Sequence, residues 1–273
     1  MNYSTLMVHL DAGASNSVVL DAAAAVAKRQ GAKVIGVAAC QPMQIASSAG
    51  DATGATITLE RDIANANLDQ AEQEFQTFAA LQPYALEWRS INTMQPVSQA
   101  VAGDAACADL LIASACLGHS SNASNHANVG DLIVRAGRPV LVVPDAPTPE
   151  TFATIMVAWS GTRECRRAVT DALPFLKRAI QVVVVAIASD SEDARSQTHD
   201  VVAWLGRHQI NANQIVYKPH GNIADSLATI AREQEADLIV AGAYGHNRLR
   251  EWAFGGVTSD VLLRENCCAL LSH

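Results

Sequence analysis

The amino-acid sequence consists of two similar halves, and this repeat limits the fold more than any other feature. Residues 5–11 align with residues 154–160, each an apolar run followed by a small polar turn. Residues 108–113 align with residues 236–241, where an Ala-Asp pair leads into an apolar run. The offset is 149 residues at the first match and 128 at the second, so the first copy carries 21 more residues between the two points. We expect these in the polar stretch 41–58 and in a longer helix after it. The chain is therefore predicted to contain two copies of one domain.

Within each copy, short aliphatic runs alternate with stretches of helical periodicity, the pattern of βαβ units around a parallel sheet. The aliphatic runs predict strands near 5–10, 33–39, 84–90, 109–114 and 139–143 in the first copy, and near 153–159, 181–188, 213–218, 236–241 and 267–272 in the second. Prolines in residues 144–150 prevent a regular element between the copies. The predicted fold class is α/β, with two tandem five-stranded parallel-sheet domains of Rossmann-like type at residues 1–147 and 148–273.

Composition and charge argue against several classes of protein. Hydrophobic residues make up 49% of the 273 residues and charged residues only 17%, which favours a large core over a disordered chain. The net charge is −8 and no lysine or arginine cluster breaks it, so nucleic acid is not expected as a partner. Residues 1–4 lack a basic n-region, and the longest apolar run, residues 182–188, is too short to cross a bilayer. We expect a cytoplasmic protein with no membrane partner.

The cysteines lie in apolar segments without the spacing of a disulfide framework or a metal site; they are Cys40, Cys107, Cys116, Cys165, Cys267 and Cys268. We predict reduced side chains that pack in the core. For the adjacent Cys267 and Cys268 a redox switch or a thiolate metal site is the alternative, although neighbours in a strand point to opposite faces. A further alternative is a metal site of two histidines and an aspartate, namely His119 and His126 with Asp104 or Asp109. Its spacing matches no known metal motif, so no metal ligand is predicted.

A glycine-rich segment follows the predicted strand 236–241, at the end of the strand where open parallel sheets bind their ligands. Gly242 and Gly245 come directly after the strand, and nine residues later Gly255 and Gly256 open an amphipathic stretch. Glycines let two backbone segments approach each other and expose N–H groups, and a helix N-terminus adds a partial positive charge. This arrangement is typical of polyphosphate binding. A helix cap and a turn are the purely structural interpretation.

The segment resembles the universal stress protein family, whose nucleotide-binding members carry G-x2-G-x9-G followed by Ser or Thr. Gly242, Gly245 and Gly255 match this pattern in register. Gly256 replaces the hydroxyl residue, and Thr258 falls on the family's next hydroxyl position. Both halves also have the family's opening strand, Ala-Asp pair and closing apolar strand. The resemblance implies a tandem member with the adenine nucleotide alpha hydrolase-like fold. It also implies a cytoplasmic stress-response role and ATP or AMP as ligand, with or without Mg²⁺.

The two halves depart from the family pattern in opposite ways. The family's nucleotide-binding aspartate matches Asp11 in the first half, but Ser160 stands there in the second. The first half has side chains where the glycine loop belongs, in residues 114–117 and at Ala127 and Asn128. We therefore expect a degraded nucleotide site in the first half. Its remaining polar residues suit a different small ligand; they are His119, Ser120, Ser121, Asn122, Asn125 and His126.

The spacing and the resemblance together predict an adenine nucleotide site in the second half. The nucleoside is assigned to Ala158, Trp159, Ser160 and Ala186, and the phosphates to Gly242, Tyr244, Gly245, His246, Arg248, Gly255, Gly256, Val257 and Thr258. Trp159 either stacks on the base or packs in the core. No catalytic residue is predicted. One alternative function is a scaffold that has lost nucleotide binding, and another is slow ATP hydrolysis with His246 as the base to test.

The closing strands of the two halves carry the prediction for assembly. Single-domain members of the resembled family pair through the closing strand of the sheet. Residues 140–143 and 269–271 are both apolar, and an unpaired apolar edge strand invites association. We therefore predict an internal pseudo-dimer, related by an approximate two-fold axis, in which each closing strand contacts the other domain. The expected partners are a small-molecule nucleotide and the two domains themselves.

Overall fold

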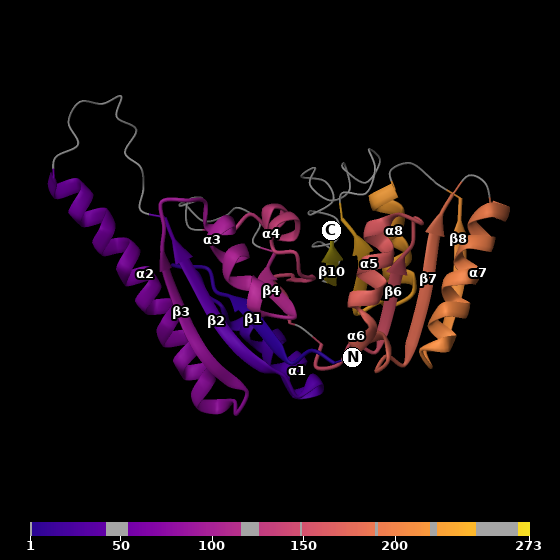
Figure 1. Cartoon of the computed structure of the whole chain (residues 1–273), viewed down its shortest axis with the longest axis horizontal. Helices are drawn as coiled ribbons and strands as arrows, with labels where there is room; N and C mark the ends of the chain where they lie inside the picture. The colour runs from indigo at the N-terminus through magenta and orange to yellow at the C-terminus, as the bar shows by residue number, and fades with distance from the viewer. Residues whose placement is uncertain are drawn as a thin grey trace, which may run out of the picture.

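The computed structural model describes residues 2–41, 54–115, 126–147, 149–188, 191–218, 223–243 and 267–273. Each half of the chain alternates strands and helices (Figure 1). The first half contains β1 (Thr5–His9), α1 (Ser17–Gln30), β2 (Lys33–Cys40), α2 (Gly54–Leu81), β3 (Ala85–Asn92), α3 (Val97–Asp104), the short 3-10 helix η1 (Ala105–Cys107), β4 (Leu110–Ser114), α4 (Val129–Arg135) and β5 (Val140–Val143). The second half contains β6 (Thr154–Ala158), α5 (Arg163–Asp171), α6 (Leu173–Leu176), β7 (Gln181–Ile187), α7 (Ser191–Arg207), β8 (Ala212–Tyr217), α8 (Ile223–Glu233), β9 (Leu238–Gly242) and β10 (Cys268–Ser272).

The strands of the described residues form one ten-stranded sheet in the order β3-β2-β1-β4-β5-β10-β9-β6-β7-β8. Within each half all neighbouring strands are parallel and the first strand lies at the centre, so the α/β fold class predicted from the repeat is confirmed. The halves meet where β5 and β10 pair antiparallel, with Leu141 opposite Leu270. An antiparallel pair between two equivalent strands is what an approximate two-fold axis requires, and it leaves neither closing strand as a sheet edge.

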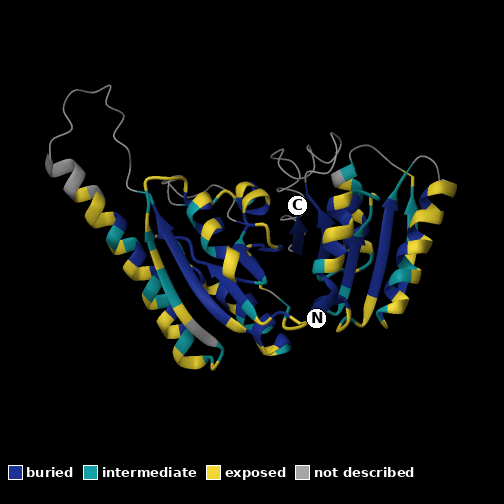
Figure 2. Cartoon of the chain, viewed as in Figure 1, coloured by how far each residue is buried: buried dark blue, intermediate teal, exposed yellow. Residues whose placement is uncertain are grey.

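Helices cover both faces of this sheet, and the strands between the outer strands β3 and β8 are buried along most of their length (Figure 2). One face carries α1 and α2 from the first half and α5, α6 and α7 from the second; the other carries α3, α4 and α8. Because both faces are covered, the inner strands are largely apolar runs, as in the buried valines of β7.

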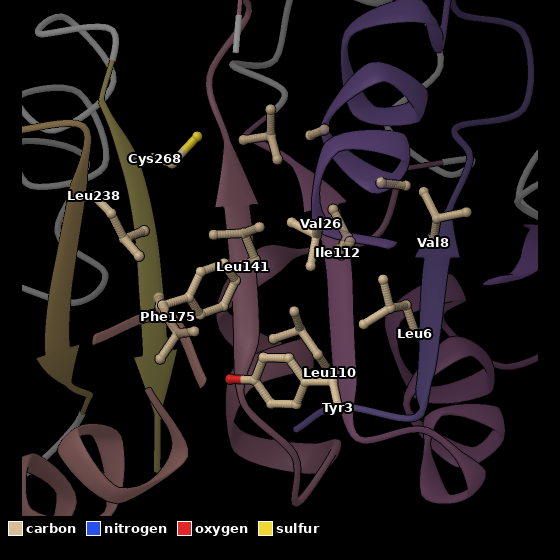
Figure 3. Close-up of a cluster of buried hydrophobic side chains, with 14 of the residues drawn as sticks. Tyr3, Leu6, Val8, Val26, Leu110, Ile112, Leu141, Phe175, Leu238 and Cys268 are labelled. Atoms are coloured by element: carbon tan, nitrogen blue, oxygen red, sulfur yellow. The ribbon is translucent and has the colours of Figure 1, made fainter. Parts of the chain in front are cut away.

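The core on the first of these faces continues across the junction of the halves (Figure 3). The rings of Tyr3 and Phe175, from opposite halves, lie 5.6 Å apart in an edge-to-face arrangement. The Tyr3 hydroxyl also donates a 2.6 Å hydrogen bond to the carbonyl of Asp171. Arg167 donates to the carbonyl oxygens of His273 and Gly137, at 2.9 and 2.7 Å. Apolar packing and hydrogen bonds thus join the two halves.

The repeated Ala-Asp pair has a structural role that is the same in both halves. Asp109 Oδ2 accepts hydrogen bonds from the backbone N–H groups of Ser4 and Thr5, at 2.7 and 3.0 Å. Asp237 Oδ2 accepts from the N–H groups of Ala153 and Thr154, both at 2.8 Å. Each aspartate therefore ties the start of the fourth strand of its half to the start of the first, at the edge of the sheet opposite the predicted ligand site.

The longer helix predicted for the first half is α2, which has 28 residues where its counterpart α7 has 17. Residues 42–53 of the polar stretch before it lie outside the described residues. No helix in the described part of the chain is long and apolar enough to span a membrane.

The cysteine prediction is right for four positions and wrong for one. Cys40, Cys165, Cys267 and Cys268 are buried, and the last two lie on opposite faces of the sheet, as alternation along a strand requires. Cys107 is exposed instead of buried. It occupies the last position of η1, a single turn at the protein surface, where its sulfur lies 3.3 Å from the Arg89 guanidinium. Cys116 lies outside the described residues.

Candidate functional site

The carboxyl ends of β6, β7 and β9 bring together the described members of the predicted nucleotide site. Ala158 ends β6 and pairs with Val185 of β7 on one side and with Ala241 of β9 on the other. The Trp159 N–H donates a 2.8 Å hydrogen bond to the Val185 carbonyl, which holds the start of the next loop beside β7. Ala158, Trp159, Ser160, Ala186 and Gly242 therefore lie along one edge of the sheet. The remaining predicted positions lie outside the described residues; they are Tyr244, Gly245, His246, Arg248, Gly255, Gly256, Val257 and Thr258.

Gly242 is needed for helix packing at this edge. A Cβ built on Gly242 would lie 2.3 Å from the Cys165 nitrogen and 2.4 Å from the Glu164 carbonyl carbon, both backbone atoms of the first turn of α5. No side chain larger than hydrogen fits there without moving α5 away from β9. The sequence interpretation placed this glycine against phosphate, whereas its missing side chain faces the helix.

Ser160 lies in the four-residue loop between β6 and α5. Its hydroxyl lies 3.0 Å from the Cys165 sulfur and 3.5 Å from the Thr162 hydroxyl, so it presents a neutral polar group beside the start of α5. Thr162 is the N-cap of α5, and its hydroxyl accepts a hydrogen bond from the Cys165 N–H. Gly161 between them has a φ of +69°, which favours glycine, and a Cβ there would lie 2.7 Å from Gln197 Oε1.

Trp159 lines a cavity of about 580 Å³ between α5 and α7. Its ring is half-buried and packs against the core, while its Nε1–H is buried and has no hydrogen-bond acceptor among the residues that the structure describes. Sequence reasoning missed the other polar and aromatic residues of this cavity, which are Arg166, Thr170, Gln197, Asp200 and Trp204. No sequence motif marks these residues, because they lie on two helices that come together only in the folded chain.

The equivalent edge of the first half contains a buried charged cluster instead. Asp11 Oδ1 lies 3.2 Å from His126 Nδ1 and 3.8 Å from His9 Nδ1, and all three side chains are largely buried. In the second half the repeat places Ala158 where His9 stands and Ser160 where Asp11 stands. The carboxylate that the resemblance assigned to nucleotide is therefore already engaged by a histidine of the same chain.

The cluster shifts the pKa values of its members in a consistent pattern. Burial alone would raise the pKa of Asp11, but His126, His9 and the Ala127 N–H together hold it below its ordinary value. The Asp11 carboxylate raises the pKa of His126. Burial lowers the pKa of His9, which therefore favours its neutral form. Asp11 and His126 thus form an ion pair beside a neutral histidine.

The alternative metal site is not supported within the part of the chain that the structure describes. There, no group of three histidine, cysteine or acidic side chains has metal-binding geometry. Asp109 lies at the opposite edge of the sheet from His126, where it binds backbone N–H groups. Asp104 pairs with Arg89 at 3.5 Å. His119 lies outside the described residues.

Comparison with known proteins gives one family and one fold. Residues 151–272 match the model of the Universal stress protein family. No curated protein sequence matches the chain significantly. A universal stress protein from Archaeoglobus fulgidus DSM 4304 has a similar structure, with a TM-score of 0.71, 11% identity, and coverage of 98% of this chain and 95% of that one. A functionally unknown protein from Pseudomonas aeruginosa PAO1 is also similar, with a TM-score of 0.64 and 14% identity. The match covers 99% of this chain and 92% of that one. At such low identity these structures show that the whole chain shares their fold.

Proposed function

We propose, from the premise that the C-terminal half of this chain belongs to the universal stress protein family, that this half binds an adenine nucleotide and that the chain acts in the cytoplasmic response to stress. The observation that carries the proposal is the position of the glycine spacing. The segment from Gly242 to Thr258 begins at the end of β9, which lies directly beside β6. Ligands of open parallel sheets bind at this edge, where strand order reverses.

The proposed roles follow from the chemistry of each position. Backbone N–H groups of the glycine segment hold the phosphates, and His246 and Arg248 supply positive charge. The backbone of residues 158–160 and the Ala186 side chain contact the nucleoside, and the Ser160 hydroxyl stands in place of the family's carboxylate. ATP or AMP is the ligand, with Mg²⁺ as an accompanying ion where the phosphate chain is long enough. We assign the domain boundary to the proline-rich linker, between residues 147 and 148.

The first half is proposed not to bind nucleotide. Its carboxylate, Asp11, is held by His126, and Ser114 stands where the second half has Gly242. The two halves have thus diverged, with the charged cluster kept in the half without the glycine segment.

Isothermal titration of the full chain with ATP, ADP and AMP tests this function. We expect one nucleotide per chain, and Gly255→Val should weaken binding by about tenfold or more because a side chain would displace the phosphates. The matched control is Gly103→Val in α3, where a Cβ meets no atom within 4 Å. It should bind like the original chain. Absence of heat at millimolar nucleotide, with folded protein, would refute the proposal and favour the scaffold function.

A further inference from the structure

The cavity beside Trp159 has a counterpart in the first half. One cavity, of about 580 Å³, lies between α5 and α7, and the other, of about 510 Å³, lies between α1 and α2. The two helix pairs cover the same face of the sheet. Both volumes fall in the range of small-molecule sites. The fold thus forms a similar cavity in each half, and the side chains decide what each can bind.

Equivalent positions of the two cavities can be assigned from the helices that form them. The offset of 149 residues between the repeats places Arg166 of α5 at the position of Ser17 of α1, and both side chains are exposed. The buried Leu205 of α7 corresponds to the buried Phe78 of α2, which places Trp204 at the position of Thr77. All four residues so assigned line their cavities. The repeat register places Trp159 at the position of Leu10, which is buried.

The second cavity therefore differs from the first by two indole rings and a guanidinium. Trp204 is half-buried, and its ring also contacts the His208 ring at 4.4 Å between centroids. Arg166 is exposed, and it uses one N–H to bind the Gly161 carbonyl at 3.0 Å, which leaves further donors. Trp159 adds a second, half-buried indole ring to the cavity.

We propose that the cavity between α5 and α7 binds a flat aromatic carboxylate, at a site separate from the nucleotide phosphates. The ring packs against the indoles of Trp159 and Trp204, and the carboxylate pairs with Arg166. Asp200, on the α7 wall, selects against larger negative charge such as a phosphate chain. The cavity of the first half, with Thr77 and Ser17 at the corresponding positions, lacks the rings and the cation for such a ligand.

The test uses quinoline-2-carboxylate as probe, titrated into the full chain without nucleotide. We expect saturable binding of one probe per chain. Cyclohexanecarboxylate, which lacks the flat ring, should bind at least about tenfold more weakly. Trp204→Thr and Arg166→Ser install the residues that the first half carries, and each should weaken binding by about tenfold. Thr77→Ala, in the other cavity, should change affinity less than about twofold.

Further variants distinguish failure of this proposal from failure of the proposed nucleotide binding. If Trp204→Thr does not fold, Trp204→Phe retains a ring and should keep binding within about threefold. Gly255→Val should bind the probe normally even where it has lost nucleotide. No saturable heat at millimolar probe, or unchanged affinity in Trp204→Thr, would overturn the proposal. The proposal would also be overturned if AMP displaced the probe and if Gly255→Val bound neither AMP nor the probe. The cavity would then be part of the nucleotide site.

Discussion

Replacing Gly242 with alanine is expected to destabilise the chain by about 3 kcal/mol, through overpacking against the backbone of α5. The added Cβ would lie 2.3 Å from the Cys165 nitrogen and 2.4 Å from the Glu164 carbonyl carbon. Flexible side chains can rotate away from such a contact, but backbone at the start of a capped helix cannot. Thermal unfolding followed by circular dichroism should show a melting temperature lower by roughly 10 °C.

Two other glycines provide controls for this substitution. Gly103 in α3 and Gly206 in α7 are exposed, and a Cβ at either position meets no atom within 4 Å. Alanine there should stabilise the chain by about 0.5–1 kcal/mol, since glycine is a poor helix former. If Gly242→Ala melts at the same temperature as these controls, the close packing of α5 on β9 is wrong.

Replacing His126 with alanine is expected to cost about 3 kcal/mol of stability near pH 5.5, because it leaves the buried Asp11 carboxylate without its ion-pair partner. The pair distance is 3.2 Å, and the side chains of His126 and Asp11 are only 14% and 7% exposed. Asp11→Asn combined with His126→Ala removes both charges, so it should be more stable than His126→Ala alone. Urea unfolding of the three proteins gives these differences directly.

The contribution of this pair should depend on pH in both directions. The pKa of His126 is raised, so its contribution is complete below the ordinary value of 6.5 and is lost as pH rises through the raised value. The pKa of Asp11 is lowered, so its contribution is complete above the ordinary value of 3.8 and is lost as pH falls through the lowered value. The stability difference between the original chain and His126→Ala should therefore be largest between about pH 4 and 6.5.

The neighbouring His9 affects stability with the opposite trend to His126. Its pKa is lowered by burial, so it stabilises the fold above 6.5 and loses that effect as pH falls through its lowered value. Because His9 is present in both proteins, this effect largely cancels in the difference. A stability difference that does not vary between pH 4 and 9 would mean that His126 acts only through packing.

The repeat and the aliphatic runs were sufficient to predict the strands and the fold class, because strands buried on both faces are written in the sequence as continuous apolar segments. The same reasoning found the longer α2 and the edge that holds Ala158, Ser160 and Ala186. These features can be predicted from the local sequence pattern and the general geometry of parallel sheets. Their prediction does not require knowing which helices contact one another.

The features that sequence reasoning missed all depend on contacts between distant elements. Gly242 packs against the first turn of α5, although these segments lie far apart in the sequence. Trp204 faces the same cavity as Trp159 only after α7 has packed beside α5. His126 meets Asp11 across the edge of the sheet, although 115 residues separate them in the chain. Cys107 was predicted to be buried from its apolar neighbours, but it ends a surface turn.

Native mass spectrometry of the intact chain, mixed with ATP or AMP in separate samples, measures nucleotide binding directly. We expect one bound adenine nucleotide per chain, with the bound fraction strongly reduced in Gly255→Val and unchanged in Gly103→Val. Two nucleotides per chain would contradict the proposal that the first half has lost its site. A chain that remains folded and binds no nucleotide at millimolar concentration would contradict the proposed function itself.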